Sequence, residues 1–222
     1  MAMNKAKHIN IAVLVSGHGR GSNLQAIIDA CNDGRITGKV AVVIGVEDDA
    51  PAMERARSQG IATVAIRSKD FDSDEAYGAR ILEVLAEHET ALVCLAGYMR
   101  ILPSSVVSAY RHRIMNIHPA LIPLFCGTGM FGERVHQAAV DYGVKVSGCT
   151  VHFVDEEYDT GPIVIQKCVP VEEGDTAETL AARILVQEHK AYPEAIQLFA
   201  EGRLRVEGRV VHVRPLEFGH DG

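Results

Sequence analysis

Short apolar runs alternate with stretches of helical periodicity along the first half of the chain. This alternation is typical of βαβ units, in which buried parallel strands are joined by helices. Strands are predicted at residues 9–15, 39–46, 62–66, 91–96 and 113–117. Helices are predicted between them at residues 23–32, 51–59 and 73–87. The pattern therefore predicts a parallel sheet that is covered by helices.

The hydrophobic pattern changes after residue 144. Two long β runs, 145–154 and 162–171, flank an acidic turn at 155–161, which predicts an antiparallel hairpin. A long helix is predicted at 176–200 and a small two-stranded piece at 204–213. Together the two halves predict an α/β fold: an open, mostly parallel twisted sheet with helices on both faces, a C-terminal antiparallel hairpin and a long helix.

Composition and charge narrow the class of protein. Of the 222 residues, 47% are hydrophobic and 23% are charged. No apolar run approaches the roughly 18 to 20 residues that cross a bilayer. A net charge of −7 without clustered Lys and Arg argues against a nucleic-acid binder. Five cysteines without a C-x-x-C pair indicate a reducing compartment. We therefore expect a cytoplasmic protein with no membrane or nucleic-acid partner.

A glycine-rich turn, Ser16-Gly17-His18-Gly19-Arg20-Gly21-Ser22-Asn23, lies between the first strand and the first helix. Glycine lets a backbone approach a ligand closely, and the free N–H groups of a helix N-terminus favour an anion such as phosphate. The spacing also approximates a dinucleotide fingerprint, with Glu47 or Asp48 as the ribose-binding acid. A plain tight turn would use glycine too, so these residues alone leave three interpretations open.

A second candidate site follows the strand at 113–117. Asn116 and His118 share one face at its carboxyl end, where open α/β sheets hold their active sites. An amide beside an imidazole can supply an oxyanion donor and a proton carrier. Asp159, in the hairpin turn, can orient His118 and stabilise its protonated form, or it can be a local turn cap. A His before Pro can also be an ordinary loop residue, so the residues alone do not decide.

Six segments along the chain carry a family resemblance. In order they read GSNLQAI (21–27), AGYMRIL (96–102), NIHP (116–119), GCTVHFV (148–154), DTGP (159–162) and QEH (187–189). This series closely resembles the glycinamide ribonucleotide formyltransferases, the folate-dependent enzymes of purine synthesis, from residue 11 to about residue 205. The resemblance implies a Rossmann-like formyltransferase fold in one domain, 1–222, with a phosphate-binding half (1–110) and a catalytic and folate-binding half (111–215).

The resemblance also implies a reaction. The formyl group of 10-formyltetrahydrofolate, a co-substrate, passes to the amine of glycinamide ribonucleotide by direct attack, and no metal takes part. The products are N-formylglycinamide ribonucleotide and tetrahydrofolate. Asn116 N–H and protonated His118 would stabilise the oxyanion, while Asp159 would keep His118 protonated and help a water carry a proton to the folate nitrogen. A monomer or homodimer that binds these two small molecules is expected.

Roles for further residues follow from the same resemblance. Gly21, Ser22 and Asn23 would cradle the substrate phosphate, and Glu188 would contact the ribose or glycinamide part. The implied folate site consists of Met99, Arg100, Ile101, Leu102, Asn116, Asp155, Glu156, Glu157 and Tyr158.

Three features depart from the family pattern. Leu185 stands where relatives often carry a cationic or amide residue near the phosphate. Asp74 stands where some relatives carry an Arg implicated in folate binding. The glycine-rich stretch 124–132 is longer than in many relatives. We expect a mobile loop there, with His136 returning to the site.

Other functions remain open. Formyltetrahydrofolate hydrolase and tRNA formyltransferase share the folate-binding architecture, but members of both classes carry an extra domain that 222 residues do not accommodate. A nicotinamide-dependent oxidoreductase would bind its dinucleotide at the turn formed by residues 17–22. A catalytically silent nucleotide-binding module is a further alternative, which the lack of a hydrogen-bond donor at Leu185 supports. Acyl transfer through Cys126 and His118 is the covalent alternative to direct attack.

Overall fold

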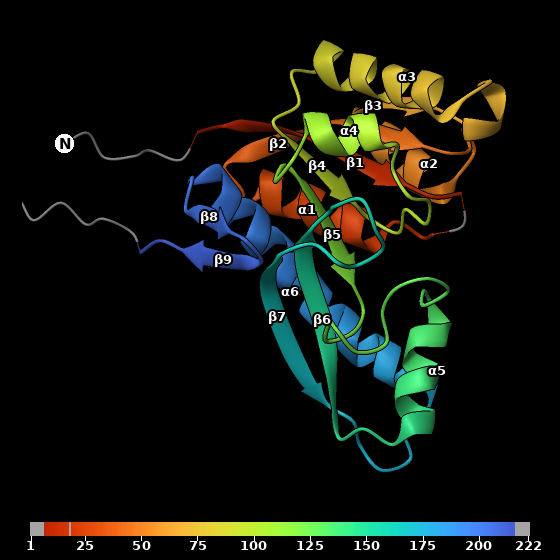
Figure 1. Ribbon diagram of the computed structural model, residues 1–222, viewed down its shortest axis with the longest axis vertical. Coiled ribbons are helices and arrows are strands. Elements are labelled where there is room, and N and C mark those ends of the chain that lie inside the picture. Colours follow the sequence, from red (N-terminus) through yellow and green to blue (C-terminus); the bar gives the residue numbers. More distant parts are fainter. Residues whose placement is uncertain (1–6, 18, 216–222) are drawn as a thin grey trace, which may run out of the picture.

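A nine-stranded sheet runs through the computed structural model, which describes residues 7–17 and 19–215 (Figure 1). His18 of the glycine-rich turn and both chain ends lie outside this description. The order across the sheet is β3-β2-β1-β4-β5-β6-β7-β9-β8. The strands are β1 (Ile9–Val15), β2 (Gly38–Gly45), β3 (Ala62–Ala65), β4 (Leu92–Leu95), β5 (Ile114–His118), β6 (Val146–Phe153), β7 (Ile163–Pro170), β8 (Leu204–Glu207) and β9 (Val210–Val213).

The pairing confirms the predicted mostly parallel sheet with an antiparallel hairpin. Strands β3, β2, β1, β4 and β5 are parallel, and β6 and β7 continue the sheet in antiparallel pairs. The two-stranded piece predicted at 204–213 forms as β8 and β9. It is not a separate unit, because Ile163 of β7 pairs in parallel with Val210 of β9. The sheet is therefore two strands wider than the hydrophobic pattern indicates.

Helices cover both faces of the sheet, as predicted (Figure 1). On one face lie α1 (Ser22–Asn32), α2 (Pro51–Ser58) and α6 (Ala177–Ala200), and on the other lie α3 (Asp74–Glu87) and α4 (Ser104–Ala109). A short turn, η1 (Ser68–Asp70), precedes α3, and α5 (Glu133–Tyr142) packs against α6. The sequence pattern does not predict α4 or α5. The 6 residues of α4 are too few for a clear period, and α5 follows directly on the glycine-rich stretch.

Alternation along β5 decides which side chains face the candidate active site. Met115 and Ile117 join the core under α1 and α6, whereas Ile114 joins the core under α3 and α4. Because successive strand residues point to opposite faces, Asn116 and His118 lie on the side of Ile114. The predicted shared face of Asn116 and His118 is confirmed.

Candidate active site

The register between β5 and β6 brings an unpredicted side chain to the site. Asn116 is the direct partner of His152 in the antiparallel pair, so their side chains lie next to one another. Asn116 Nδ2 is 3.2 Å from His152 Nε2. The segment GCTVHFV contains His152, but strand register cannot be read from one sequence, and no role was predicted for this imidazole.

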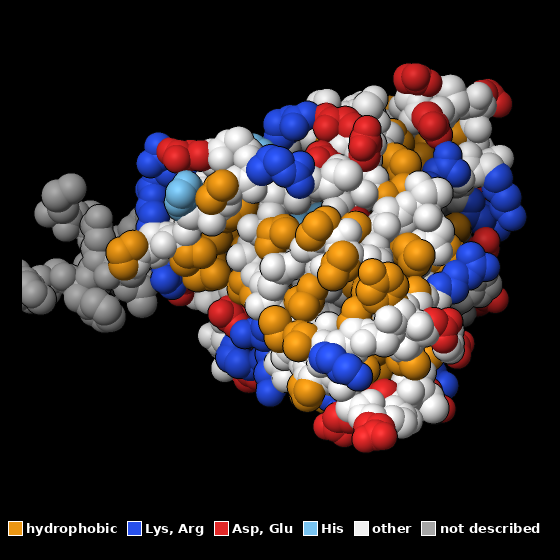
Figure 2. Space-filling model, turned by 60° about the horizontal axis from the view of Figure 1, so that its bottom comes forward, with side chains coloured by type: hydrophobic (Ala, Val, Ile, Leu, Met, Phe, Trp, Pro, Cys, Tyr) orange, Lys and Arg blue, Asp and Glu red, His pale blue; other side chains and the backbone are white. Residues whose placement is uncertain are grey.

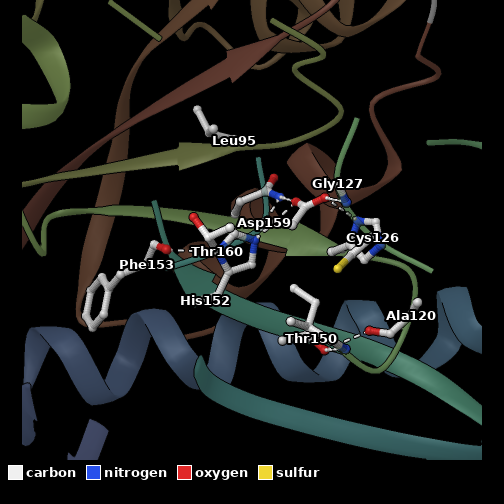
Figure 3. A network of polar contacts seen from close by, with 12 residues as sticks. Leu95, Ala120, Cys126, Gly127, Thr150, His152, Phe153, Asp159 and Thr160 are labelled. Atoms are coloured by element: carbon white, nitrogen blue, oxygen red, sulfur yellow. Dashed lines mark hydrogen bonds and ion pairs between the residues drawn. The ribbon is translucent and has the colours of Figure 1, made fainter. Parts of the chain in front are cut away.

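The Asp159 carboxylate lies at the centre of a polar cluster (Figure 3). Its Oδ2 is 3.5 Å from His118 Nδ1 and accepts a hydrogen bond from Gly127 N at 2.9 Å. Its Oδ1 is 3.5 Å from both His152 Nε2 and Asn116 Nδ2. The three residues predicted as a catalytic group, Asn116, His118 and Asp159, therefore meet, although 43 positions separate Asn116 from Asp159. Together with His152, these three residues form what we call the active-site cluster.

The turn between β6 and β7 holds Asp159 in place. Asp159 itself has a left-handed backbone, with φ +57°, which Asp and Asn tolerate better than most residues. Thr160 Oγ1 donates to Asp155 Oδ1 at 2.5 Å, and Phe153 N donates to the Pro162 carbonyl at 2.9 Å. These bonds close the turn at both ends, so the carboxylate is positioned by the backbone and not only by its partners.

The loop after β5 is tied to the cluster at several points. Thr150 Oγ1 donates to the Ala120 carbonyl at 2.7 Å and accepts from Ile122 N at 3.1 Å (Figure 3). Further along, the Phe125 carbonyl is 2.8 Å from His118 Nε2, and Gly127 N reaches Asp159. The stretch 124–132 was expected to be a loop, which it is. Its predicted mobility stays a prediction.

His118 has a defined tautomer in this arrangement. A carbonyl oxygen can only accept a hydrogen bond, so Nε2, which faces the Phe125 carbonyl, carries a proton. Nδ1, which faces Asp159, is then the nitrogen that gains and loses a proton. Burial lowers the pKa of His118 below its ordinary value, and the opposing attraction of Asp159 is smaller. We therefore revise the expectation of a protonated His118: in the free protein the neutral form is favoured at neutral pH.

The pKa of Asp159 is held below its ordinary value. Burial would raise it, but the contacts of the carboxylate with His152, His118 and Gly127 N together outweigh burial. The group is therefore an ionised acceptor at neutral pH.

His136 of α5 lies beside the active-site cluster, as expected. The residue is buried, and burial together with the nearby His118 lowers the pKa of His136 to about 4. Its Nδ1 has no hydrogen-bond partner within the described residues. A neutral imidazole therefore borders the catalytic group on the α5 side.

The predicted phosphate cradle lies at the N-terminus of α1. Gly21 caps the helix with φ +70°, and a Cβ there would come within 3.0 Å of the Ala52 Cβ. Asn23 Nδ2 donates to Glu188 Oε2 at 2.7 Å, so two predicted substrate contacts are joined across 165 positions. Ser22 lines an adjoining pocket of about 320 Å³ together with Gln25, Ala26, Asp29, Arg35, Arg55 and His189.

Arg55 brings a positive charge to this helix end. Its Nη1 donates to Gln25 Oε1 at 2.7 Å and its Nη2 to the Arg20 carbonyl at 3.2 Å. Both acceptors are neutral, and the buried Nε has no partner in the part of the chain that the structure describes. These contacts do not neutralise the guanidinium. Arg55 was not predicted from the sequence, because only the packing of α2 against Gly21 brings it there.

The segments predicted to bind folate lie side by side. Tyr158 Oη donates to the Met99 carbonyl at 3.4 Å, which joins 99–102 to the turn at 155–158. The Met99 and Ile101 side chains are 47% and 44% exposed, whereas Leu102 is buried under α3 and α4. Leu102 therefore has only its backbone to offer a ligand. Figure 2 shows hydrophobic side chains gathered between charged ones on the face that comes forward when the lower part of Figure 1 is turned to the viewer.

Two of the charged residues predicted to bind folate are already paired. Arg100 Nη2 is 2.8 Å from Asp74 Oδ1, and its guanidinium lies 5.5 Å from the centre of the Tyr77 ring. Glu156 forms an ion pair with Arg111. Asp74, which departs from the family pattern, therefore occupies the guanidinium of Arg100, a residue that the resemblance assigns to folate binding.

Among the described residues, no group of three or more His, Cys, Asp or Glu side chains is placed to hold a metal ion. In the same residues, none of the helices has both the length and the apolar character of a transmembrane span.

Glu188→Gln is expected to remove a pH-dependent loss of stability. Burial raises the pKa of Glu188, opposed by the Asn23 hydrogen bond. A carboxyl with a raised folded pKa costs stability once it ionises, so the contribution of Glu188 should fall as pH rises through that pKa. His118 and His136, whose pKa values are lowered, act in the opposite direction, so the effect is measured as a difference: in thermal melts between about pH 4 and pH 8 the melting temperature of Glu188→Gln should rise relative to that of the native protein.

Glu194→Gln, at an exposed position on the same helix, is the matched control for this measurement. It should keep the native dependence of the melting temperature on pH. If Glu188→Gln shows the same dependence as the control, ionisation of Glu188 does not contribute to it.

Comparison with known proteins places the chain in a family. The formyl transferase family model matches residues 9–196. Phosphoribosylglycinamide formyltransferase of Escherichia coli is 44% identical over 198 residues, which cover 89% of this chain and 90% of that protein. The crystal structure of glycinamide ribonucleotide transformylase 1 from Symbiobacterium toebii has 50% identity and a TM-score of 0.87, covering 94% of this chain and 95% of that one.

A formyltetrahydrofolate deformylase from Pseudomonas syringae also has a similar structure, with a TM-score of 0.82 at 24% identity. The match covers 95% of this chain and 67% of that one, and at this identity it shows a shared fold alone. The family model and the closer relatives, by contrast, match most of the sequence as well as the fold. This chain belongs to the formyl transferase family.

Proposed function

We propose that this protein transfers the formyl group of 10-formyltetrahydrofolate to the amine of glycinamide ribonucleotide in purine biosynthesis. The observation that carries the proposal is the convergence of Asn116, His118 and Asp159 at the carboxyl end of β5. The phosphoribosylglycinamide formyltransferases among its relatives support the choice of substrates. We further propose that it acts in the cytoplasm as a monomer or homodimer. Residues 1–110 would form the phosphate-binding half and 111–215 the catalytic and folate-binding half, with Met99–Leu102 of the first half completing the folate site.

The reaction forms one C–N bond and breaks another. The neutral amine of the ribonucleotide attacks the formyl carbon, which gives a tetrahedral intermediate with a negative oxygen and a positive nitrogen. The amine nitrogen then loses a proton, the folate nitrogen gains one, and the bond between that nitrogen and the formyl carbon breaks. The ionised Asp159 would accept the amine proton through a water and pass it to His118 Nδ1, 3.5 Å away, and the imidazolium formed there would stabilise the oxyanion until the proton goes on to the folate nitrogen.

The phosphate group would lie against Gly21, Ser22 and Asn23, where free N–H groups of α1 and its dipole favour an anion. Leu185 cannot donate a hydrogen bond, so the positive charge must come from elsewhere. Arg55, whose hydrogen-bond acceptors among the described residues are neutral, is the candidate that the packing supports. Glu188 would contact the ribose or glycinamide part through the network that it shares with Asn23.

The folate would lie between Met99–Leu102 and the turn formed by Asp155, Glu156, Glu157 and Tyr158, beside Asn116. The Tyr158 contact with the Met99 carbonyl supports this placement, because it brings the two segments together. The exposed Met99 and Ile101 side chains can cover an aromatic ring.

A transfer assay tests the proposed function. Purified protein with glycinamide ribonucleotide and 10-formyltetrahydrofolate should release tetrahydrofolate and formylate the ribonucleotide in equal amounts. Without the ribonucleotide, release should stop. Continued release would identify a hydrolase instead, and binding of the ribonucleotide without turnover would identify a silent nucleotide-binding module.

A further inference from the structure

The tautomer of His152 is set by its own backbone. His152 Nδ1 is 2.8 Å from the Phe153 carbonyl oxygen, and the side chain is only 2% exposed. Since that oxygen can only accept, Nδ1 carries the proton. In a neutral imidazole the other nitrogen, Nε2, is then an acceptor, which must find a donor because it is buried.

The donor is the side-chain amide of Asn116. Nε2 of His152 faces Asn116 Nδ2 at 3.2 Å and Asp159 Oδ1 at 3.5 Å. A lone pair and a carboxylate oxygen repel unless a donor lies between them. The Asn116 NH₂ group supplies two N–H bonds, and it lies within 3.5 Å of both acceptors. Turning the amide over would set its oxygen against two acceptors, so these neighbours determine its orientation.

This orientation leaves the Asn116 oxygen available. Oδ1 of Asn116 accepts no side-chain hydrogen bond from the residues that the structure describes, and it is not among the buried atoms that lack a partner. Both N–H bonds, in contrast, are already directed at His152 and Asp159. The group that Asn116 presents to an incoming substrate is therefore an acceptor.

We propose that His152 is a positioning residue that holds the Asn116 amide with its oxygen toward the substrate amine. The proposal rests on the proposed function, because it needs an amine as the nucleophile. An amine nitrogen has two N–H bonds and one lone pair. If the Asn116 oxygen accepts one N–H, the lone pair is aimed at the formyl carbon, which is the orientation that attack requires. The oxyanion is then stabilised by His118, and Asn116 acts on the nucleophile.

Two substitutions at His152 separate hydrogen bonding from packing. His152→Phe keeps a ring but has no acceptor, so the Asn116 amide can turn over. His152→Gln can present its Oε1 near the position of Nε2 and accept from Asn116 again. We expect His152→Phe to lower kcat about tenfold to a hundredfold, because the substrate amine is no longer aligned with the formyl carbon. Either KM should change little. His152→Gln should recover most of that loss.

His112→Asn is the control, because His112 packs against Phe153 with ring centres 5.7 Å apart but lies outside the active-site cluster. Its kcat should be unchanged. The proposal is overturned if His152→Phe turns over at the native rate, or if His152→Gln is as slow as His152→Phe.

A nuclear magnetic resonance measurement on the native protein tests the geometry without any variant. Nitrogen-15 spectra should show His152 protonated at Nδ1 alone, with a coupling across the hydrogen bond between Asn116 Nδ2 and His152 Nε2. A proton on Nε2 would overturn the proposal, even if the variants fail to fold. If the native protein does not transfer formyl groups, the proposed function fails, while the spectra still decide the tautomer.

Discussion

Asp159→Asn is expected to lower kcat on the order of a thousandfold while both KM values stay close to native. The carboxylate faces His118, His152, Asn116 and Gly127 N at once, and its oxygens accept hydrogen bonds from Asn116 Nδ2 and Gly127 N. Asparagine offers one oxygen and one NH₂ group. If the oxygen stays with Gly127 N, the NH₂ group meets the NH₂ of Asn116, and the negative charge that takes up the amine proton is lost.

Asparagine is the appropriate substitution because residue 159 has φ +57°, a conformation that Asn adopts readily. The fold should therefore survive, and steady-state kinetics with both substrates varied will separate kcat from KM. Cys126→Ser is the control, since direct attack needs no thiol and this variant should keep its rate. A fast Asp159→Asn would exclude the proposed role of the carboxylate. An inactive Cys126→Ser would exclude direct attack and favour acyl transfer through the cysteine.

Gly161→Ala is expected to destabilise the protein and to disable the site together. A Cβ at Gly161 would lie 1.8 Å from the Phe153 carbonyl oxygen and 2.7 Å from its carbon. Both are backbone atoms, so no side chain can move aside, and the turn must open. Overpacking typically costs about 1–3 kcal/mol, and we expect the upper end here because backbone atoms must move. Because Asp159 is two residues away, we also expect kcat to fall about a hundredfold from displacement of its carboxylate.

Thermal or urea unfolding, followed by kinetics on the folded fraction, will measure both effects. Gly19→Ala is the control for stability, because a Cβ at Gly19 meets nothing within 4 Å. Its unfolding midpoint should match the native protein. A Gly161→Ala variant with native stability and native kcat would show that the turn relaxes without moving Asp159.

The hydrophobic pattern predicted most of the elements, since burial on one face repeats along the chain. β1 was predicted at its observed bounds, Ile9–Val15. The other parallel strands, the two hairpin strands and α6 differ from their predicted bounds by no more than one residue at either end. The hairpin is long, apolar and flanked by turn residues, so its pairing is local and visible in the sequence. The 6 residues of α4 are too few to show the helical period, and α5 was missed because it follows directly on the glycine-rich stretch, although its buried Val135 and Ala139 have helical spacing.

The candidate site was predicted in part, because only its neighbours along one strand can be recognised from local alternation. Asn116 and His118 lie two residues apart on one strand, so alternation alone puts them on one face. Asp159 joined them through the family resemblance and not through any spacing. His152 and Arg55 were not predicted, because their positions depend on how β6 pairs with β5 and how α2 packs on α1.

The state of the catalytic groups also depended on the folded protein. From the sequence, a carboxylate beside His118 suggested a charged imidazole, but the buried position has the larger effect and lowers the pKa. The sequence by itself determined the α/β class, the order of its elements and the candidate residues, because these follow from local periodicity and residue chemistry. The tertiary structure decided the neighbours, tautomers and protonation of those residues, because distances and desolvation arise only when distant segments pack together.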